Sequence, residues 1–192
     1  MPRIALTGGI ACGKSLAARY LNEMGVETID ADDIVHEFIP DPDERRRIAA
    51  EVFADPEKRR ALEARIHPLV KARIAEFLAP HANSSNQTTK QPNNQTIRIA
   101  VVPLLFETHW DAEYDIICCV RSSRAAQVAR MAGTRGYSRE EAEARLAAQL
   151  PVEEKAAKSH YVIDNDGTPA ELKTRVGELV AWLKERATRA SE

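Results

Sequence analysis

Residues 8 to 15 read GGIACGKS and directly follow the apolar run Ile4 to Leu6. This text matches G-x-x-x-x-G-K-[ST], the pattern of a loop that cradles phosphate groups between a strand and a helix. Glycines let the backbone curl so that successive N–H groups point inward at phosphate oxygens, and the N-terminus of the following helix adds partial positive charge. Apolar residues after position 15 recur with helical spacing, which supplies the context that the pattern needs. The stretch therefore predicts a nucleotide-binding α/β protein.

This phosphate loop (residues 8–15) also predicts which groups meet the nucleotide. Lys14 is expected to reach the β- and γ-phosphates, and the Ser15 hydroxyl is expected to hold Mg²⁺. Cys12 is either a reactive thiol near a helix N-terminus or a small residue that fills a position of the loop. The residues expected to line the nucleotide are Gly8, Gly9, Ile10, Ala11, Cys12, Gly13, Lys14 and Ser15.

Length and composition limit the organisation and the partners of the chain. With 192 residues, 44% of them hydrophobic, it can bury one core, so we expect a single domain over residues 1–192. A formal net charge of -2 gives no global basic field, so we expect no nucleic-acid partner. No apolar run approaches the roughly 18 residues of a membrane span, and no leader precedes the first strand. We expect a cytoplasmic protein with no membrane partner, which suits three cysteines that cannot all pair.

Five short apolar or β-branched runs alternate with segments of helical periodicity and charge. They occupy residues 3–7, 26–29, 97–102, 115–120 and 160–164. Strands that alternate with helices predict a parallel sheet with both faces covered, and thus a three-layer α/β/α fold with a five-stranded parallel sheet. Ligands bind at the carboxyl ends of the strands in such a sheet. We therefore expect three loops to converge on one site, at residues 8–15, 30–36 and 103–107.

Three segments between the strands are expected to form insertions. Residues 34–80 have apolar spacing typical of helices and predict a helical subdomain. Residues 81–96 are polar and of low complexity, which predicts a flexible surface loop. Residues 121–159 carry several arginines around the turn-like Gly133 to Gly136, and we interpret them as an arginine-bearing lid. For any single arginine there, the alternative is a solvated helix face.

Three carboxylates, Asp30, Asp32 and Asp33, follow the second predicted strand. Sheet geometry aims them toward the phosphate loop, where a carboxylate can orient or accept the proton of an attacking hydroxyl. In an extended chain Asp30 and Asp32 share a side and Asp33 points away. The alternative is a helix N-cap, because Asp before Ile34 is a common way to begin a helix.

Two further segments carry weaker signals. His67 is followed by Pro68 inside a helical region, which predicts a break because proline removes an N–H and disfavours helix in the residue before it. A lone histidine is more often structural than catalytic. Residues 102–107 form an apolar run at the ligand-binding edge, which packs either against an apolar arm of a substrate or against the core.

Sequence segments spread over nearly the whole chain resemble those of the dephospho-coenzyme A kinase family. The phosphate loop alone is shared with many NTPases, but its combination with the other segments is specific to this family. The matching segments, in chain order, are LTGGI (6–10) with GKS (13–15), IDAD (29–32), LE (62–63) with IHPLV (66–70), VPLLFE (102–107), Arg145 with AAQ (147–149), and VIDNDG (162–167).

The resemblance implies a P-loop kinase-like fold and transfer of the γ-phosphate of ATP, with Mg²⁺, to the ribose 3′-hydroxyl of dephospho-coenzyme A. By match to the family's D-A-D text, Asp32 would be the general base, and Asp30 would support the metal or substrate region. Lys14 and Arg145 complete the set of catalytic residues that the resemblance implies. Residues 34–80 would be the acceptor-binding subdomain.

The remaining site residues are also implied by the resemblance. Asn165, in the text of the last strand, would lie near the nucleotide base. The lid arginines would contact phosphates, and other residues would lie by the acceptor. These substrate-binding candidates are Arg130, Arg135, His67, Pro103 and Leu104, together with Asp30 and Asp32.

The chain departs from the family pattern in two places, and two other functions stay open. Residues 38–43 cross in a few residues a gap that the family fills with a longer helical stretch, so we expect a trimmed acceptor-binding subdomain. Residues 81–96, in contrast, are longer than the family needs. The alternatives are another small-molecule or nucleotide P-loop kinase, and a nucleotide-binding module without catalysis. A GTPase switch would carry an N-K-x-D element, which the sequence lacks.

Overall fold

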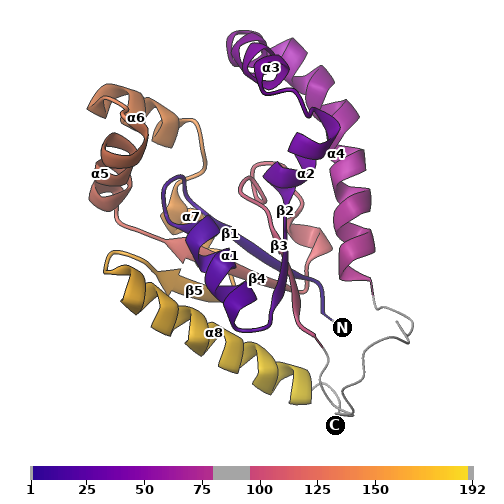
Figure 1. Cartoon of the computed structure of the whole chain (residues 1–192), viewed down its shortest axis with the longest axis vertical. Coiled ribbons are helices and arrows are strands. Elements are labelled where there is room, and N and C mark those ends of the chain that lie inside the picture. Colours follow the sequence, from indigo (N-terminus) through magenta and orange to yellow (C-terminus); the bar gives the residue numbers. More distant parts are fainter. Residues whose placement is uncertain (1, 80–95, 190–192) are drawn as a thin grey trace.

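The protein is described by a computed structural model that covers residues 2–79 and 96–189. Within these residues the five predicted strands form one parallel sheet in the order β2-β3-β1-β4-β5 (Figure 1). Each strand begins and ends within one residue of its predicted bounds, and the five-stranded parallel sheet is confirmed. The strands are β1 (Ile4–Gly8), β2 (Glu27–Asp30), β3 (Arg98–Val101), β4 (Ile116–Arg121) and β5 (Tyr161–Asp164).

The burial of the central strand β1 explains why the strands could be predicted from apolar runs. Leu6 lies opposite Val101 of β3 on one side and Cys118 of β4 on the other, and every residue of β1 is buried. A parallel strand with both faces covered needs an almost continuous apolar run rather than alternation. Residues Ile4 to Leu6, before the phosphate loop, form such a run.

Helices cover both faces of the sheet and make the expected three layers. On one face α1 (Lys14–Glu23) and α8 (Pro169–Arg189) pack over Ile4 and Leu6, with Leu21 and Leu179 in the same buried cluster (Figure 1). A second buried cluster on the other face contains Ala5. Its other members include Ile34, Val70, Ile74, Leu105, Phe106 and Trp110.

Two groups of helices extend from the sheet, one on each side of the phosphate loop, and α3, α5 and α6 lie farthest from the strands (Figure 1). The first group is α2 (Ala31–Phe38), α3 (Pro42–Ala54) and α4 (Pro56–Leu78). The second group lies in the predicted lid segment and is α5 (Arg124–Arg135), α6 (Arg139–Ala147) and α7 (Val152–Ala157). A short 3₁₀ helix, η1 (Asp111–Glu113), precedes β4.

The helix α4 runs through Pro68 without a break, so the break expected at His67-Pro68 was wrong. Proline removes one intrahelical hydrogen bond, to the carbonyl of Ala64. Both Ala64 and Pro68 are exposed, so water can satisfy that carbonyl. Val70 and Ile74, in the following turns, are buried in the core and hold the continued helix on the sheet.

The polar loop expected over 81–96 lies outside the described residues apart from its last position. In the described part of the chain, no helix is both long enough and apolar enough to cross a membrane.

Candidate active site

The loops predicted to converge do leave the same edge of the sheet. β2, β3 and β1 are neighbouring parallel strands, so the residues that follow them lie side by side. A hydrogen bond joins two of the strand ends, because the Thr7 hydroxyl donates to the Pro103 carbonyl at 3.4 Å. The third segment, after β2, begins α2 at the same edge.

The backbone of the phosphate loop has conformations that only glycine accepts easily. Gly8 has a φ of 151°, and a Cβ there would lie 2.3 Å from the carbonyl oxygen of Val120 on the neighbouring strand. Gly13 is left-handed, with a φ of 91°, and caps α1 without a side-chain hydrogen bond. The first N–H groups of α1 therefore have no side-chain partner at the cap and can bind an anion.

Lys14 folds back over its own loop. Its ammonium donates to the carbonyls of Gly9 at 2.8 Å and of Gly8 at 3.1 Å. Burial lowers the pKa of Lys14, and the charge of Lys155 lowers it further, whereas the nearby Asp32 raises it. The ammonium thus lies in a partly dry position against neutral acceptors, where an anion would be a better partner.

The three carboxylates after β2 have separate roles in the local structure. Asp30 ends the strand and is the N-cap of α2, since its Oδ1 accepts a 2.9 Å hydrogen bond from the N–H of Asp32. The helix begins at Ala31, so the extended geometry assumed for Asp30 and Asp32 was wrong. It is Asp30, not Asp32 or Asp33, that takes the capping role, because β2 turns into α2 with no intervening loop.

Asp32 lies in the first turn of α2, where the residue keeps an exposed surface and its carboxyl is within electrostatic reach of Lys14. The surrounding protein partly removes water from the carboxyl, which raises the pKa of Asp32, while the charges of Lys14 and His36 lower it. Burial likewise raises the pKa of Asp30. Asp33 points to a different neighbour, His36, at 3.9 Å. The structure therefore brings Asp32 and Lys14, but not Asp33, within electrostatic reach of each other.

Three side chains hold the carbonyls of the phosphate loop. Gln127 Nε2 donates to the Ile10 carbonyl at 2.7 Å, Arg130 Nη1 to the Ala11 carbonyl at 3.3 Å, and Asn165 Nδ2 to the Cys12 carbonyl at 2.8 Å. These hydrogen bonds fix the carbonyls of the loop, and the N–H of Cys12 donates to the Gly9 carbonyl at 3.3 Å within the loop itself. Gln127, which is 3% exposed, was not predicted. The sequence feature that could have indicated Gln127 is its position three residues before Arg130, which places both residues on one face of a helix.

The predicted lid arginines lie in different surroundings. Arg130 also donates to Ser122 Oγ at 2.9 Å and to the Asn165 carbonyl, so both of its terminal nitrogens are engaged. Arg145 is exposed in α6, and its guanidinium stacks over the ring of Tyr137 at 4.3 Å. Arg135 is the last residue of α5, and its side chain lies outside the described part. None of the described contacts joins Arg145 to the phosphate loop.

Cys12 and Ser15 differ in accessibility. The Cys12 side chain is 0% exposed, and burial raises the pKa of its thiol although Lys14 opposes the shift. A buried neutral thiol favours the interpretation of Cys12 as a small residue that fills the loop. Ser15 is exposed in the first turn of α1, which leaves its hydroxyl open to a ligand.

The segment after β3 divides its side chains between the core and the site. Leu105 and Phe106 are buried in the second cluster, whereas Leu104 is 41% exposed. His67, on α4, packs its ring edge-on against Trp110, with 5.0 Å between ring centroids, and burial lowers its pKa. The core interpretation therefore holds for Leu105 and Phe106, and contact with a substrate stays a prediction for Leu104.

Residues 3–44 and 42–171 match the family model described as dephospho-CoA kinase. The chain belongs to the dephospho-CoA kinase family. The family predicted from the motifs is thus confirmed, and with it a kinase that uses ATP. The two matched segments meet at residues 42–44, next to the stretch 38–43 where we expected residues of the family to be missing.

Curated relatives match over nearly their whole length. A dephospho-CoA kinase of Synechococcus sp. (strain JA-3-3Ab) is 38% identical over 208 residues, which cover 90% of this chain and 89% of that protein. One from Geobacter sulfurreducens is 35% identical over 206 residues, with 94% and 97% covered. Both alignments are longer than the 192-residue chain, so these dephospho-CoA kinases have residues that this chain lacks.

Solved structures place the fold among small kinases. A crystal structure of a protein from Thermus thermophilus has a TM-score of 0.74 at 31% identity, and covers 96% of this chain and 97% of that one. Shikimate kinase from Bacteroides thetaiotaomicron has a TM-score of 0.61 at 15% identity, with 95% and 98% covered, and shares the fold alone. The predicted P-loop kinase-like fold is confirmed.

Proposed function

We propose that the chain transfers the γ-phosphate of ATP to the ribose 3′-hydroxyl of dephospho-coenzyme A, which gives coenzyme A and ADP, the last step of coenzyme A synthesis. Family membership supports this reaction. The observation that carries it is the placement of Lys14 and Asp32, each in the first turn of a helix that follows a strand at the same carboxyl edge of the sheet. A phosphate-binding cation and a carboxylate able to accept a proton are thus present at one place.

The phosphate loop supplies the donor site. Backbone N–H groups at the start of α1 bind the phosphates, and Lys14 exchanges the carbonyls of Gly8 and Gly9 for β- and γ-phosphate oxygens. This exchange is favourable because a partly buried ammonium interacts more strongly with an anion than with a neutral carbonyl. Asn165, Gln127 and Arg130 keep the loop in the shape that receives the phosphates.

Mg²⁺ fits the oxygen donors at this edge. Among the described residues no cluster of three or more His, Cys, Asp or Glu side chains could hold a metal by itself. Mg²⁺ in kinases is bound by one or two protein oxygens together with substrate phosphates and waters, so the exposed Ser15 hydroxyl matches its needs, and Asp30, within electrostatic reach of Lys14, is the second candidate. When bound, the ion neutralises phosphate charge.

Asp32 acts as the general base. Its carboxylate accepts the proton of the 3′-hydroxyl as that oxygen forms a bond to the γ-phosphorus, and the bond from the γ-phosphorus to the bridging oxygen of ADP breaks. Loss of hydration raises the pKa of Asp32, which brings the carboxylate closer to the basicity that proton transfer at neutral pH requires. The nearby Lys14 keeps it ionised.

The lid and the acceptor segment complete the proposal. Arg145 carries its charge on an exposed helix without a carboxylate neighbour among its described contacts, so it is available to the transferred phosphate. Arg135 is proposed to contact phosphate as well, whereas Arg130 acts mainly through the loop that it holds. On the acceptor side, the exposed Leu104, the neighbouring Pro103 and His67 form the surface for dephospho-coenzyme A.

The setting of the reaction follows from composition. A net charge of -2 supports a small-molecule acceptor rather than nucleic acid. The three cysteines are free and buried, which supports a reducing, cytoplasmic location.

The test is Mg²⁺-dependent ADP release from ATP by the purified protein with no acceptor, with dephospho-coenzyme A, with adenosine and with nucleoside monophosphates. We expect strong stimulation by dephospho-coenzyme A alone. Stimulation by another acceptor in its place would move the function to a different small-molecule kinase, and stimulation by none would indicate a binding module.

A further inference from the structure

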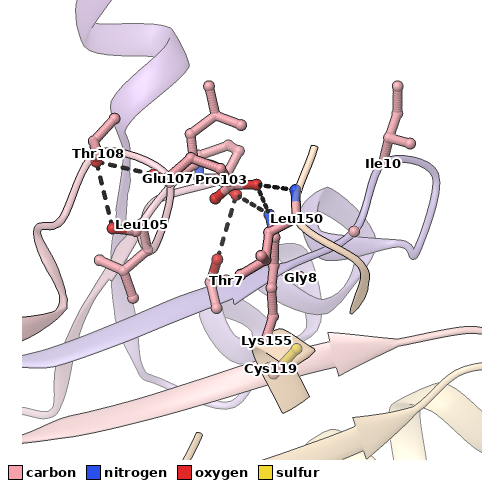
Figure 2. A network of polar contacts seen from close by, with 12 residues as sticks. Thr7, Gly8, Ile10, Pro103, Leu105, Glu107, Thr108, Cys119, Leu150 and Lys155 are labelled. Carbon is pink, nitrogen blue, oxygen red and sulfur yellow. Dashed lines mark hydrogen bonds and ion pairs between the residues drawn. The ribbon is translucent and has the colours of Figure 1, made fainter. Parts of the chain in front are cut away.

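A fully buried lysine lies next to the acceptor segment, and the proposed reaction gives it no catalytic or substrate-binding role. Lys155, on α7, is 0% exposed, and its Nζ lies 2.7 Å from Glu107 Oε1 and 3.0 Å from the Pro103 carbonyl (Figure 2). An ammonium is costly to remove from water, and this cost is offset only where charged and polar partners surround it. The position of Lys155 therefore depends on the segment 103–107.

The Lys155 ammonium fixes one end of this segment. The Pro103 carbonyl accepts hydrogen bonds from Lys155 and from the Thr7 hydroxyl, so it is held between α7 and the end of β1 (Figure 2). The next residue, Leu104, is 41% exposed, and its carbonyl accepts from the Thr108 hydroxyl at 2.9 Å. The exposed Leu104 side chain, which is proposed to contact the acceptor, thus follows a backbone carbonyl to which Lys155 donates.

Glu107 fixes the other end of the segment and joins it to the lid. Its Oε1 accepts the Lys155 ammonium and also the N–H of Leu150 at 3.1 Å (Figure 2). Leu150 lies between α6, which carries Arg145, and α7. The second oxygen, Oε2, is buried without a hydrogen-bond partner. Apolar residues would fill such a site at lower cost, so the pair is poorly explained as a device for stability.

We propose that Lys155 and Glu107 are positioning residues that couple the arginine-bearing lid to the acceptor segment. A movement of the lid on binding ATP is carried through Leu150 to Glu107, and from there to Pro103 and Leu104. Lys155 and Glu107 make no described hydrogen bond to the phosphate loop, and Lys155 acts on Lys14 only through its charge, so the coupling is expected to act mainly on the acceptor. The assignment of this segment to dephospho-coenzyme A rests on the proposed function.

The first test separates positioning from stability with the double variant Lys155→Met/Glu107→Leu. Removing one charge strands the other, whereas removing both leaves an apolar site that folds. We expect a thermal midpoint near that of wild type, a KM for dephospho-coenzyme A raised by about tenfold or more, and a KM for ATP within about twofold. A folded double variant with both KM values unchanged overturns the proposal, because the pair would then be structural only.

A matched control is the exposed pair Lys173 and Glu23, which has the same 2.7 Å separation and links α8 to α1. The variant Lys173→Met/Glu23→Leu is expected to keep both KM values. Should Lys155→Met/Glu107→Leu fail to fold, Lys155→Met/Glu107→Gln removes both charges and the link between the two residues while the amide oxygen still accepts from Leu150, and we expect the same split of KM values. An unchanged KM for dephospho-coenzyme A in that variant also overturns the proposal.

A second measurement reports the coupling without the acceptor. The chain has two tryptophans, and the backbone N–H of Trp110 donates to the Leu105 carbonyl at 3.0 Å, so Trp182→Phe leaves one reporter next to the acceptor segment. We expect a non-hydrolysable ATP analogue to change Trp110 fluorescence in this background and not after Lys155→Met/Glu107→Leu. The same change in both contradicts the coupling. A wild-type enzyme that dephospho-coenzyme A does not stimulate contradicts the proposed function instead, and the fluorescence result still decides the coupling.

Discussion

The side-chain amide of Asn165 donates a 2.8 Å hydrogen bond to the carbonyl oxygen of Cys12, which ties the end of β5 to the phosphate loop. Asn165 is 5% exposed, and its own carbonyl accepts hydrogen bonds from Ser122 and Arg130. The loop is therefore shaped by residues far away in the sequence as well as by its own glycines.

Replacing Asn165 by alanine is expected to leave the Cys12 carbonyl without its partner. We expect a loss of stability of about 1–3 kcal/mol and weaker ATP binding, because the loop loses one of its three holding side chains. Denaturant unfolding and calorimetric titration with ATP measure the two effects. Asn22→Ala, which removes an exposed side-chain hydrogen bond to Thr28, is the control and should change neither by much. Equal ATP affinity in wild type and Asn165→Ala contradicts this role.

Gly13→Ala is expected to abolish nucleotide binding. A Cβ at Gly13 would lie 2.3 Å from Asn165 Nδ2, and the backbone is left-handed there. Gly25 offers a matched control, since its φ is 81° but nothing lies within 4 Å of its Cβ. Gly25→Ala should therefore cost only the left-handed strain of about 1–2 kcal/mol and keep ATP binding. A Gly13→Ala protein that binds ATP as tightly as Gly25→Ala would show that the close approach is relieved without harm.

Asp32→Asn is expected to keep ATP binding and to lose about a hundredfold or more of the turnover, because the amide cannot accept the proton of the acceptor hydroxyl. Asp33→Asn is the control, since Asp33 faces His36 rather than the phosphate loop. Steady-state ADP release with the acceptor, together with ATP titration, measures both. Comparable turnover in the two variants contradicts the assignment of the base.

The pH dependence follows from the raised pKa of Asp32. As pH falls, the carboxyl takes up its proton above the ordinary aspartate range, so activity should decline on the acid side at a higher pH than an unperturbed aspartate gives. The ionised carboxylate that supports activity lowers the stability of the fold. A carboxyl whose pKa is higher in the folded than in the unfolded state opposes folding at neutral pH, so Asp32→Asn should raise the thermal midpoint there and lose this advantage as pH falls. A lower midpoint for Asp32→Asn at neutral pH contradicts this.

Much of the fold could be predicted from the sequence because buried parallel strands leave continuous apolar runs, as around Ile4 and Leu6. The phosphate loop was equally visible, since its glycines and Lys14 have fixed spacing. Local sequence patterns gave wrong helix bounds where exposure to solvent or packing determined the structure. Pro68 is tolerated because its lost hydrogen bond faces water, and α2 begins at Ala31 because Asp30 caps it directly.

Some of the residues that tie the site together could not be predicted from the sequence. Lys155 and Glu107 lie in different segments, and a lysine in a charged stretch indicates a solvated face rather than a buried ion pair. Gln127 has no motif at all, and its role depends on the packing of α5 against the phosphate loop. These contacts exist only once the topology has brought distant segments together.

The most direct measurement is ³¹P NMR of the product formed from Mg²⁺–ATP and dephospho-coenzyme A, alongside the same reaction with the acceptor's 3′-deoxy analogue. We expect a new phosphate monoester on the ribose 3′-oxygen, formed in step with ADP, and no phosphate transfer to the 3′-deoxy analogue. A phosphorylated product from the 3′-deoxy analogue, or ADP formed without a new monoester, would contradict the proposed reaction.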